Sequence, residues 1–321
     1  MEMVLEKQGL DMQSGMSDKL FVAVWMVTYN HEDYIEQAIE SIVNQKANFL
    51  YKLFIGEDCS TDNTRQICIG LKEKYPDKIH LVLNERNVGA SQNAQKIFNL
   101  CFNSGAKYVA MCEGDDYWTA PLKLQKQVEF LEENEEYVIH SGKAQILKDN
   151  KLGKTIGDPL SKKTYDIADF YTKNNLVTCT AMFRNISISL SNFEGLVFGD
   201  WKLYTLLLSQ KSGNLAYVAD VIYSVYRIHE GGVMQKITRQ HENAEAHIKQ
   251  IESVNKDVNS KFTKQDTQII NSYCISIFDH QLQKSRYKEC IAVLFRNIFL
   301  VKYKFPLRNY LGLIKYYKFS I

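Results

Sequence analysis

The part of the sequence best suited to chemistry is the acidic hexapeptide Glu113–Trp118, which reads EGDDYW. It follows the apolar run Tyr108–Cys112, a pattern typical of a buried parallel strand. The carboxylates of Glu113, Asp115 and Asp116 should therefore converge where this strand ends, and like charges this close need a cation or hydrogen bonds to compensate them. Carboxylate oxygens suit Mg²⁺ and Mn²⁺, and these ions also bind phosphate oxygens. The hexapeptide therefore predicts a site for a metal ion and a diphosphate; a solvated acidic turn before a helix is the alternative.

The first half of the sequence supplies a scaffold for these carboxylates. Four strand-like runs are each followed by a polar loop and by apolar residues at helical spacing: Leu20–Val27, Lys52–Gly56, Ile79–Leu83 and Tyr108–Cys112. Strand–helix alternation implies right-handed crossovers and a parallel sheet that opens its polar loops on one edge. The predicted fold class is α/β, with a Rossmann-like, mostly parallel sheet flanked by helices. Neither Gly-x-Gly-x-x-Gly nor a P-loop motif is present in the sequence, so dinucleotide-binding and P-loop functions lose their main support.

The second half has a looser pattern and ends in helices. The sequence predicts a helix opening at Phe198–Trp201, a loop over residues 150–161, and further strands at Val138–Ser141, Ala144–Leu147, Leu176–Arg184 and Val221–Tyr226. From about residue 237 the pattern is helical to the end. We therefore expect three parts: an N-terminal lead-in at residues 1–19, an α/β domain at residues 20–236 and a helical C-terminal extension at residues 237–321.

Composition narrows the class of protein. The chain has 321 residues, of which 45% are hydrophobic and 24% charged, as expected of a soluble globular protein with a sizeable core. A net charge of +2 gives no electrostatic case for nucleic acid as a partner. The seven scattered cysteines, with no Cys-x-x-Cys pair, argue against a disulfide framework and a zinc site. With acidic residues near the N-terminus and no long apolar run, neither a signal peptide nor a membrane span is expected, so the predicted location is cytoplasmic.

Five short motifs follow one another along the chain: Val27–Asn30, Glu57–Asp62, Asn87–Gly89, Glu113–Trp118 and Gly199–Trp201. In this order and strand–loop context they resemble the family 2 glycosyltransferases with the GT-A fold, over roughly residues 20–232. The nearest look-alikes are bacterial enzymes that build capsule, O-antigen or other surface polysaccharides. The resemblance implies a metal-dependent enzyme that moves a sugar from a nucleotide-diphosphate donor to an acceptor hydroxyl with inversion. It makes a UDP-sugar the expected donor and a glycan or lipid-linked glycan the expected acceptor.

The resemblance implies donor-binding roles for residues in the loops at the predicted sheet edge: Thr28, Tyr29, Asn30, Glu57, Asp58, Asn87, Gly89 and Asp115. Arg227 and His229 join these candidates because they lie in a late glycine-rich loop that could close over the diphosphate. Among these, Asp58 would hydrogen-bond the base, and Arg227 or His229 could add positive charge beside the diphosphate. The metal ion, Mn²⁺ or Mg²⁺, would be held by four residues: Asp116 as the firmest ligand, with Asp115, Glu113 and His229.

The proposed reaction also needs a general base. The acceptor hydroxyl must lose a proton as it attacks, which calls for a carboxylate on the face opposite the leaving group. The resemblance makes Asp200 the candidate catalytic residue, and a position at the start of a predicted helix would hold it rigidly; from local sequence alone, a plain helix N-cap is the expected role. His31, between a predicted strand and helix, is expected to be a capping or solvated residue rather than a ligand.

The final stretch, residues 284–321, combines apolar and aromatic residues with nine Lys and Arg against the single acidic residue Glu289. This composition fits an amphipathic surface that rests on anionic lipid, or an ordinary helical subdomain or dimer contact. The first interpretation adds a peripheral contact with the inner face of the cell membrane.

Two other functions remain open at this point. A sugar-1-phosphate nucleotidyltransferase also uses an α/β sheet and acidic metal ligands, but it would want a glycine-rich, basic loop early in the chain, and residues 28–34 contain neither Gly nor Lys. A catalytically inactive relative that binds a nucleotide or glycan is the other alternative, against which the intact Asp116 and Asp200 speak.

Overall fold

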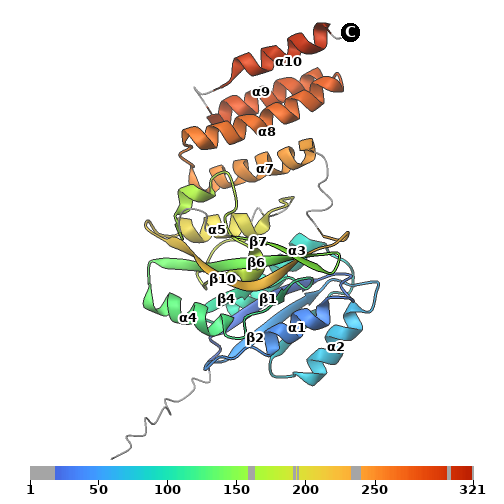
Figure 1. Cartoon of the computed structure of the whole chain (residues 1–321), viewed down its shortest axis with the longest axis vertical. Helices are drawn as coiled ribbons and strands as arrows, with labels where there is room; N and C mark the ends of the chain where they lie inside the picture. Colours follow the sequence, from blue (N-terminus) through green and yellow to red (C-terminus); the bar gives the residue numbers. More distant parts are fainter. Residues whose placement is uncertain are drawn as a thin grey trace, which may run out of the picture.

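The computed structural model describes residues 19–157, 163–190, 193, 195–232, 240–301 and 305–319. A ten-stranded sheet flanked by helices forms one part of the molecule, and a stack of C-terminal helices extends from it (Figure 1). The predicted fold class is confirmed: the sheet is mixed but mostly parallel, helices flank it, and a helical C-terminal extension follows.

The N-terminal half of the sheet is entirely parallel, with strand order β3-β2-β1-β4. Alternate residues of β1 enter two different clusters: Val24 packs with α1, whereas Trp25 packs on α3 and donates to Ala94 O at 3.2 Å. Helices therefore cover both faces, which explains why β1 reads as a continuous apolar run. The elements of this half are β1 (Val22–Thr28), α1 (Ile35–Val43), β2 (Tyr51–Glu57), α2 (Thr64–Lys74), β3 (Ile79–Leu83), α3 (Ala90–Asn103) and β4 (Tyr108–Met111).

The second half of the sheet continues from β4 in the order β9-β6-β10-β5. β9 runs antiparallel to both β4 and β6, whereas the two long strands β6 and β10 pair in parallel. This pairing brings the end of β10 beside the acidic loop that follows β4. The elements are β5 (Tyr117–Trp118), α4 (Lys123–Glu133), β6 (Tyr137–Lys148), β7 (Lys151–Ile156), β8 (Thr164–Tyr165), β9 (Met182–Arg184), α5 (Gly199–Ser209) and β10 (Leu215–Ile228).

Several predicted boundaries in this half are wrong. The predicted loop over residues 150–161 contains strand β7, which forms a hairpin with β6, while residues 158–161 lie outside the described residues. Asp149 and Asn150 both have positive φ, the conformation that a two-residue hairpin turn needs. The predicted strand Leu176–Arg184 is a strand only at its end, because Thr178–Thr180 form a 3₁₀ turn. The two strands predicted between residues 138 and 147 are one strand, β6.

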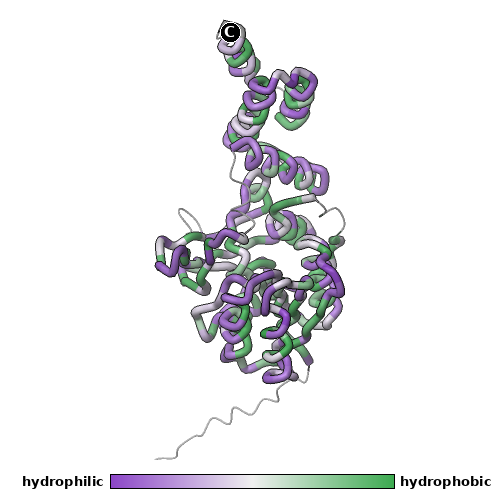
Figure 2. Tube along the Cα trace, turned by 90° about the vertical axis from the view of Figure 1, so that its right-hand side faces the viewer, coloured by the Kyte–Doolittle hydropathy of each residue, from purple (hydrophilic) through white to green (hydrophobic). Residues whose placement is uncertain are grey.

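The C-terminal helices are α7 (Gln240–Val258), α8 (Lys264–Gln283), α9 (Tyr287–Val301) and α10 (Leu307–Phe319). They stack one on another above the sheet, and hydrophobic and hydrophilic residues alternate along them (Figures 1 and 2). Trp201 of α5, Ile248 of α7 and Cys274 of α8 belong to the same buried cluster as Phe98 of α3. The extension therefore shares a core with one face of the sheet. Among the described residues, no helix combines the length and apolar character needed to cross a bilayer.

Candidate active site

The loops after β1, β2 and β4 meet at the carboxyl edge of the parallel strands. Asn30, with a left-handed φ of 54°, donates its N–H to Ser60 Oγ at 3.0 Å and accepts from Thr61 N–H at 2.8 Å. Thr28 O accepts the N–H of Asp58 at 3.1 Å. A Cβ on Gly114 would come within 2.8 Å of the Thr28 side chain, so glycine lets the acidic loop pack directly against the end of β1.

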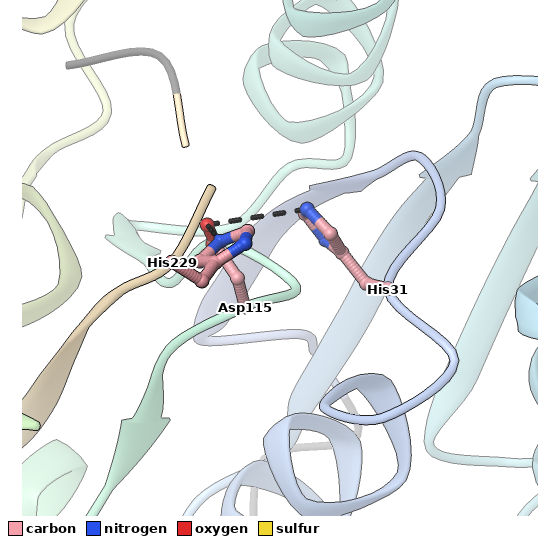
Figure 3. Close-up of side chains that lie close together, drawn as sticks. All are labelled: His31, Asp115 and His229. Carbon is pink, nitrogen blue, oxygen red and sulfur yellow. Dashed lines mark hydrogen bonds and ion pairs between the residues drawn. The ribbon is translucent and has the colours of Figure 1, made fainter. Parts of the chain in front are cut away.

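Asp115 lies between two histidines that come from opposite ends of the domain sequence (Figure 3). Its Oδ2 is 3.0 Å from Nε2 of His229, just after β10, and 3.9 Å from Nε2 of His31, just after β1. One ligand atom from each of the three residues lies within 4.8 Å of the others. Burial opposes ionisation of Asp115, but the hydrogen bond from His229 and the charges of both histidines bring its pKa below the usual value. Burial lowers the pKa of His31, with Asp115 opposing that shift.

Asp116 has a different environment, since it is only 1% exposed. Its Oδ1 accepts the backbone N–H of Arg227 at 2.8 Å, which ties the end of β10 to the acidic loop. The guanidinium of Arg227 donates to Asp115 O at 2.5 Å and lies over the rings of Tyr117 and Tyr34, at 4.6 and 5.0 Å. A cation is thus fixed beside the acidic loop. In this arrangement Asp115, rather than Asp116, faces the imidazoles, and the ligand role of Asp116 stays a prediction.

Glu113 and Asp200 form the second acidic part of the site. Oε2 of Glu113 is buried without a hydrogen-bond partner among the described residues. Burial raises the pKa of Glu113 well above its usual range, and the charges of Asp116, Asp115 and Asp200 raise it further. Asp200 therefore lies close enough for its charge to act on Glu113.

Asp200, on the first turn of α5, is held by three donors. Its Oδ2 accepts from Thr178 Oγ1 at 2.7 Å and from Asn174 Nδ2 at 2.8 Å, and its Oδ1 accepts the N–H of Trp201 at 2.8 Å. Burial raises the pKa of Asp200 although these hydrogen bonds oppose the shift. The 3₁₀ turn that replaces the predicted strand is what presents Thr178 to this carboxylate.

The predicted nucleotide-binding carboxylates Glu57 and Asp58 are engaged by the protein itself. Asp58 is 2% exposed and accepts N–H groups of Val88 and Gly89, each at 2.9 Å, so it holds the loop after β3. Glu57 accepts from Ser60 N–H at 2.6 Å and pairs with Arg65. These contacts give Asp58 a structural role, and its hydrogen bond to the base stays a prediction. Two further predicted residues, Tyr29 and Asn87, are exposed.

The structure thus brings together Glu113, Asp115, Asp116, Asp200, Arg227 and His229 of the predicted site. His31 caps α1 as expected, because its carbonyl accepts from Tyr34 and Ile35 N–H at 2.9 Å. Its side chain is 16% exposed and also turns toward Asp115, a placement that the sequence did not predict. The sequence signal for this placement was the position of His31 in a polar loop directly after a predicted strand. A pocket of about 390 Å³ opens beside His229 and Arg227.

Comparison with known proteins identifies the class. The family model described as Glycosyl transferase family 2 matches residues 23–190, so the chain belongs to this family. An uncharacterized protein of Mycobacterium tuberculosis is 27% identical over 214 residues, 66% of this chain and 60% of that protein. The putative teichuronic acid biosynthesis glycosyltransferase TuaG of Bacillus subtilis is 35% identical over 162 residues, 50% of this chain and 60% of TuaG. The chain thus matches about 60% of the length of these relatives.

Solved structures are similar in fold. Residues 1–349 of S. aureus TarS, in complex with UDP, give a TM-score of 0.61 at 16% identity, covering 94% of this chain and 92% of that one. The mannosyltransferase PcManGT from Pyrobaculum calidifontis, in complex with GDP-Man and Mn²⁺, gives 0.51 at 16% identity, covering 86% and 74%. These neighbours are GT-A glycosyltransferases, and the fold of this chain is GT-A.

Proposed function

We propose that this protein is a metal-dependent, inverting glycosyltransferase, and that it moves a sugar from a nucleotide-diphosphate donor to an acceptor hydroxyl. The observation that carries the proposal is the proximity of two acidic groups with different surroundings. Asp115 lies with His31, His229 and Arg227, whereas Asp200 is held by hydrogen-bond donors near Glu113.

The residues present fit a divalent cation. The pKa of Glu113 is raised, and its Oε2 has no hydrogen-bond partner among the described residues. A bound cation would reduce the repulsion between these neighbouring carboxylates. Asp115 and His229 would hold the ion, Mn²⁺ or Mg²⁺, with Glu113 and Asp116 as the predicted further ligands. When bound, the ion neutralises charge that develops on the departing diphosphate.

The protein's own groups supply the rest. Arg227, stacked between two tyrosine rings, presents a fixed positive charge beside the pocket near His229. Asp200 accepts the proton of the attacking hydroxyl, and its raised pKa makes it a stronger base than a solvated aspartate. Three donors keep its carboxylate in one orientation, which favours transfer from a single face.

The neighbours suggest the substrates. TarS structures contain UDP or UDP-GlcNAc, and the mannosyltransferase structure contains GDP-Man with Mn²⁺. We infer a nucleotide-sugar donor, with a UDP-sugar as the first candidate, whose nucleotide lies along the loops of Thr28–Asn30, Glu57–Asp58 and Asn87–Gly89. A glycan or lipid-linked glycan acceptor, and a role in surface polysaccharide synthesis, agree with the name of TuaG.

Release of nucleoside diphosphate tests the proposal. The full chain is incubated with UDP-, GDP- and dTDP-sugars and glycan acceptors, with Mn²⁺, Mg²⁺ or chelator. The expected result is metal-dependent release of nucleoside diphosphate from one donor, with inverted configuration in the product. Pyrophosphate formation from a nucleoside triphosphate and a sugar phosphate would instead identify a nucleotidyltransferase. Nucleotide binding without turnover would identify an inactive relative.

We also propose that α9 and α10 contact anionic lipid. One face of α9 packs on α8 through Val293 and Leu300, but the opposite face leaves four large residues 53–72% exposed: Tyr287, Ile291, Phe295 and Phe299. A helix that is apolar on both faces needs a second apolar partner. Contact between two copies of this surface would juxtapose like charges, because residues 284–321 carry nine Lys and Arg against Glu289, whereas an anionic membrane complements them. The protein would then lie on the inner face of the cell membrane.

Vesicle co-sedimentation tests this contact. The chain should bind vesicles that contain phosphatidylglycerol and should not bind pure phosphatidylcholine vesicles. Phe295→Glu combined with Phe299→Glu should abolish binding, whereas Leu152→Glu, at an equally exposed position on β7, should not. Two results would contradict the proposal. One is equal binding to charged and neutral vesicles, or equal binding by the native chain and the α9 variant. The other is a dimer that the α9 variant dissociates.

A further inference from the structure

The backbone of His31 is held firmly between two elements. Its N–H donates to Thr64 Oγ1 of α2 at 2.7 Å, and its carbonyl accepts the first N–H groups of the α1 turn, those of Tyr34 and Ile35. The position of its side chain at the end of β1 is therefore set by contacts that involve no ligand.

The orientation of the His31 ring is also set by the protein. Nδ1 lies 3.2 Å from Oγ1 of Thr28, a residue that is 2% exposed at the end of β1. With a proton on Nδ1, Thr28 accepts it, and the lone pair of Nε2 faces Asp115 Oδ2 at 3.9 Å. A metal-binding histidine commonly has this arrangement, with one nitrogen hydrogen-bonded to the protein and the other directed at the ion.

His229 presents its Nε2 to the same oxygen of Asp115, at 3.0 Å, from the other side of the site (Figure 3). Metal–ligand bonds of about 2.0–2.2 Å place neighbouring ligand atoms roughly 3–4 Å apart. The three ligand atoms already lie within 4.8 Å of one another. All three side chains are 14–19% exposed, so an ion from solvent can reach them.

Resting on the proposed function, which supplies the cation, we propose that His31 is a direct ligand of that ion together with Asp115 and His229. The protein then contributes two imidazole nitrogens beside the Asp115 oxygen, where the sequence predicted a single imidazole among the ligands. Imidazole favours transition-metal ions, whereas Mg²⁺ and Ca²⁺ prefer oxygen ligands. The site therefore selects Mn²⁺ and later first-row ions over Mg²⁺.

Electron paramagnetic resonance of bound Mn²⁺ tests this assignment without an activity assay. Mn²⁺ is titrated into the full chain with UDP present, and pulsed measurements count the coupled ¹⁴N nuclei. The native protein should show two imidazole nitrogens and His31→Gln only one, with Mn²⁺ affinity weakened about 10–100-fold. Mg²⁺ should displace Mn²⁺ poorly from the native protein and more easily from the variant.

His80→Gln is the matched control, because His80 is an exposed histidine on β3, away from the cluster. It should leave both the nitrogen count and the affinity unchanged. Thermal unfolding of metal-free His31→Gln should resemble that of the native chain, which separates ligand loss from misfolding. One coupled nitrogen in the native protein, or two in His31→Gln, would overturn the role of His31 while leaving the metal site in place. No bound Mn²⁺ in the native protein would overturn the metal-dependent function itself.

Discussion

Two groups of carboxylates lie at the same sheet edge, and they differ in how completely the protein satisfies them. Glu57 and Asp58, at the end of β2, have protein donors for both oxygens, including Ser60, Arg65 and the N–H groups of the loop after β3. Glu113, after β4, has a buried oxygen with no described partner, and burial raises its pKa. A satisfied carboxylate holds a loop in place, whereas a crowded, unsatisfied group creates a demand for an external cation. In the proposed function, the first group therefore holds the loops of the site, and the second binds the cation.

The largest effect is expected for Asp200→Asn. Asparagine keeps the size of the side chain and can still accept from Thr178, but it cannot take a proton from the acceptor. Transfer should fall about 10²–10⁴-fold while donor affinity is unchanged, as measured by kcat and by calorimetric UDP titration. Asp220→Asn, on the exposed side of β10, is the control and should leave both quantities unchanged. Near-native kcat in Asp200→Asn would remove this residue from the mechanism.

A comparison of Asp115→Asn with Asp116→Asn sharpens the assignment of the metal ligand. Asp115 faces two imidazoles, whereas Asp116 is buried and accepts the backbone N–H of Arg227. An asparagine at position 116 could still accept this N–H through its side-chain oxygen. Asp115→Asn should weaken Mn²⁺-dependent UDP binding about 10–100-fold, and Asp116→Asn should weaken it less. The opposite order, measured by calorimetry, would support the sequence-based prediction that Asp116 is the firmest ligand.

Substitutions of Glu57 and Asp58, the carboxylates that hold loops in place, should change the free energy of unfolding more than they change kcat. Glu57 is fully buried and pairs with Arg65, so Glu57→Gln leaves that guanidinium without its counter-charge. We expect a loss of about 1–3 kcal/mol in the free energy of unfolding by urea denaturation. The kcat of the folded variant should change far less than that of Asp200→Asn. If Glu57→Gln lowered kcat as much as Asp200→Asn does and left stability unchanged, Glu57 would have a chemical role rather than a structural one.

The smallest effect is expected in the pH dependence of stability. Glu113, Asp116 and Asp200 have raised pKa values in the folded protein, so the folded state binds their protons more tightly than the unfolded chain does. Stability of the metal-free protein should therefore fall as pH rises from the ordinary carboxyl range, about 4–4.5, through the raised pKa values. Glu113→Gln should flatten this slope and raise Tm at neutral pH, by about 2–4 °C for each kcal/mol recovered. Stability that rises over this range would contradict the raised pKa values.

Local sequence was sufficient for the first half of the fold. The runs at β1, β2 and β4 are apolar because both faces are covered, whereas the edge strand β3 is partly exposed. The loops after these strands share an edge because the strands are parallel. The convergence of the acidic loop with Arg227 and His229 was predicted from the late glycine-rich loop that carries both residues, although Asp115 and His229 are 114 residues apart.

Local sequence could not reveal how side chains pair across the fold. The hydrogen bonds to the Asp58 carboxylate come from N–H groups 30 and 31 residues away. The direction of the His31 ring depends on contacts with Thr28 and Asp115. The β6–β7 hairpin was missed because Asp149 and Asn150 were treated as the start of a loop, although their residue types suit a tight turn. In each case a tertiary contact, or a turn conformation, decides between two roles that the residue type alone allows.

Calorimetric titration of UDP into the native chain, with Mn²⁺ and then with chelator, tests the central claim most directly. If the acidic loop binds a cation that in turn binds the diphosphate, UDP should bind with Mn²⁺ and lose most of its affinity with chelator. Equal affinity under both conditions would contradict the claim, because Asp115 and its histidines would then have no part in holding the donor.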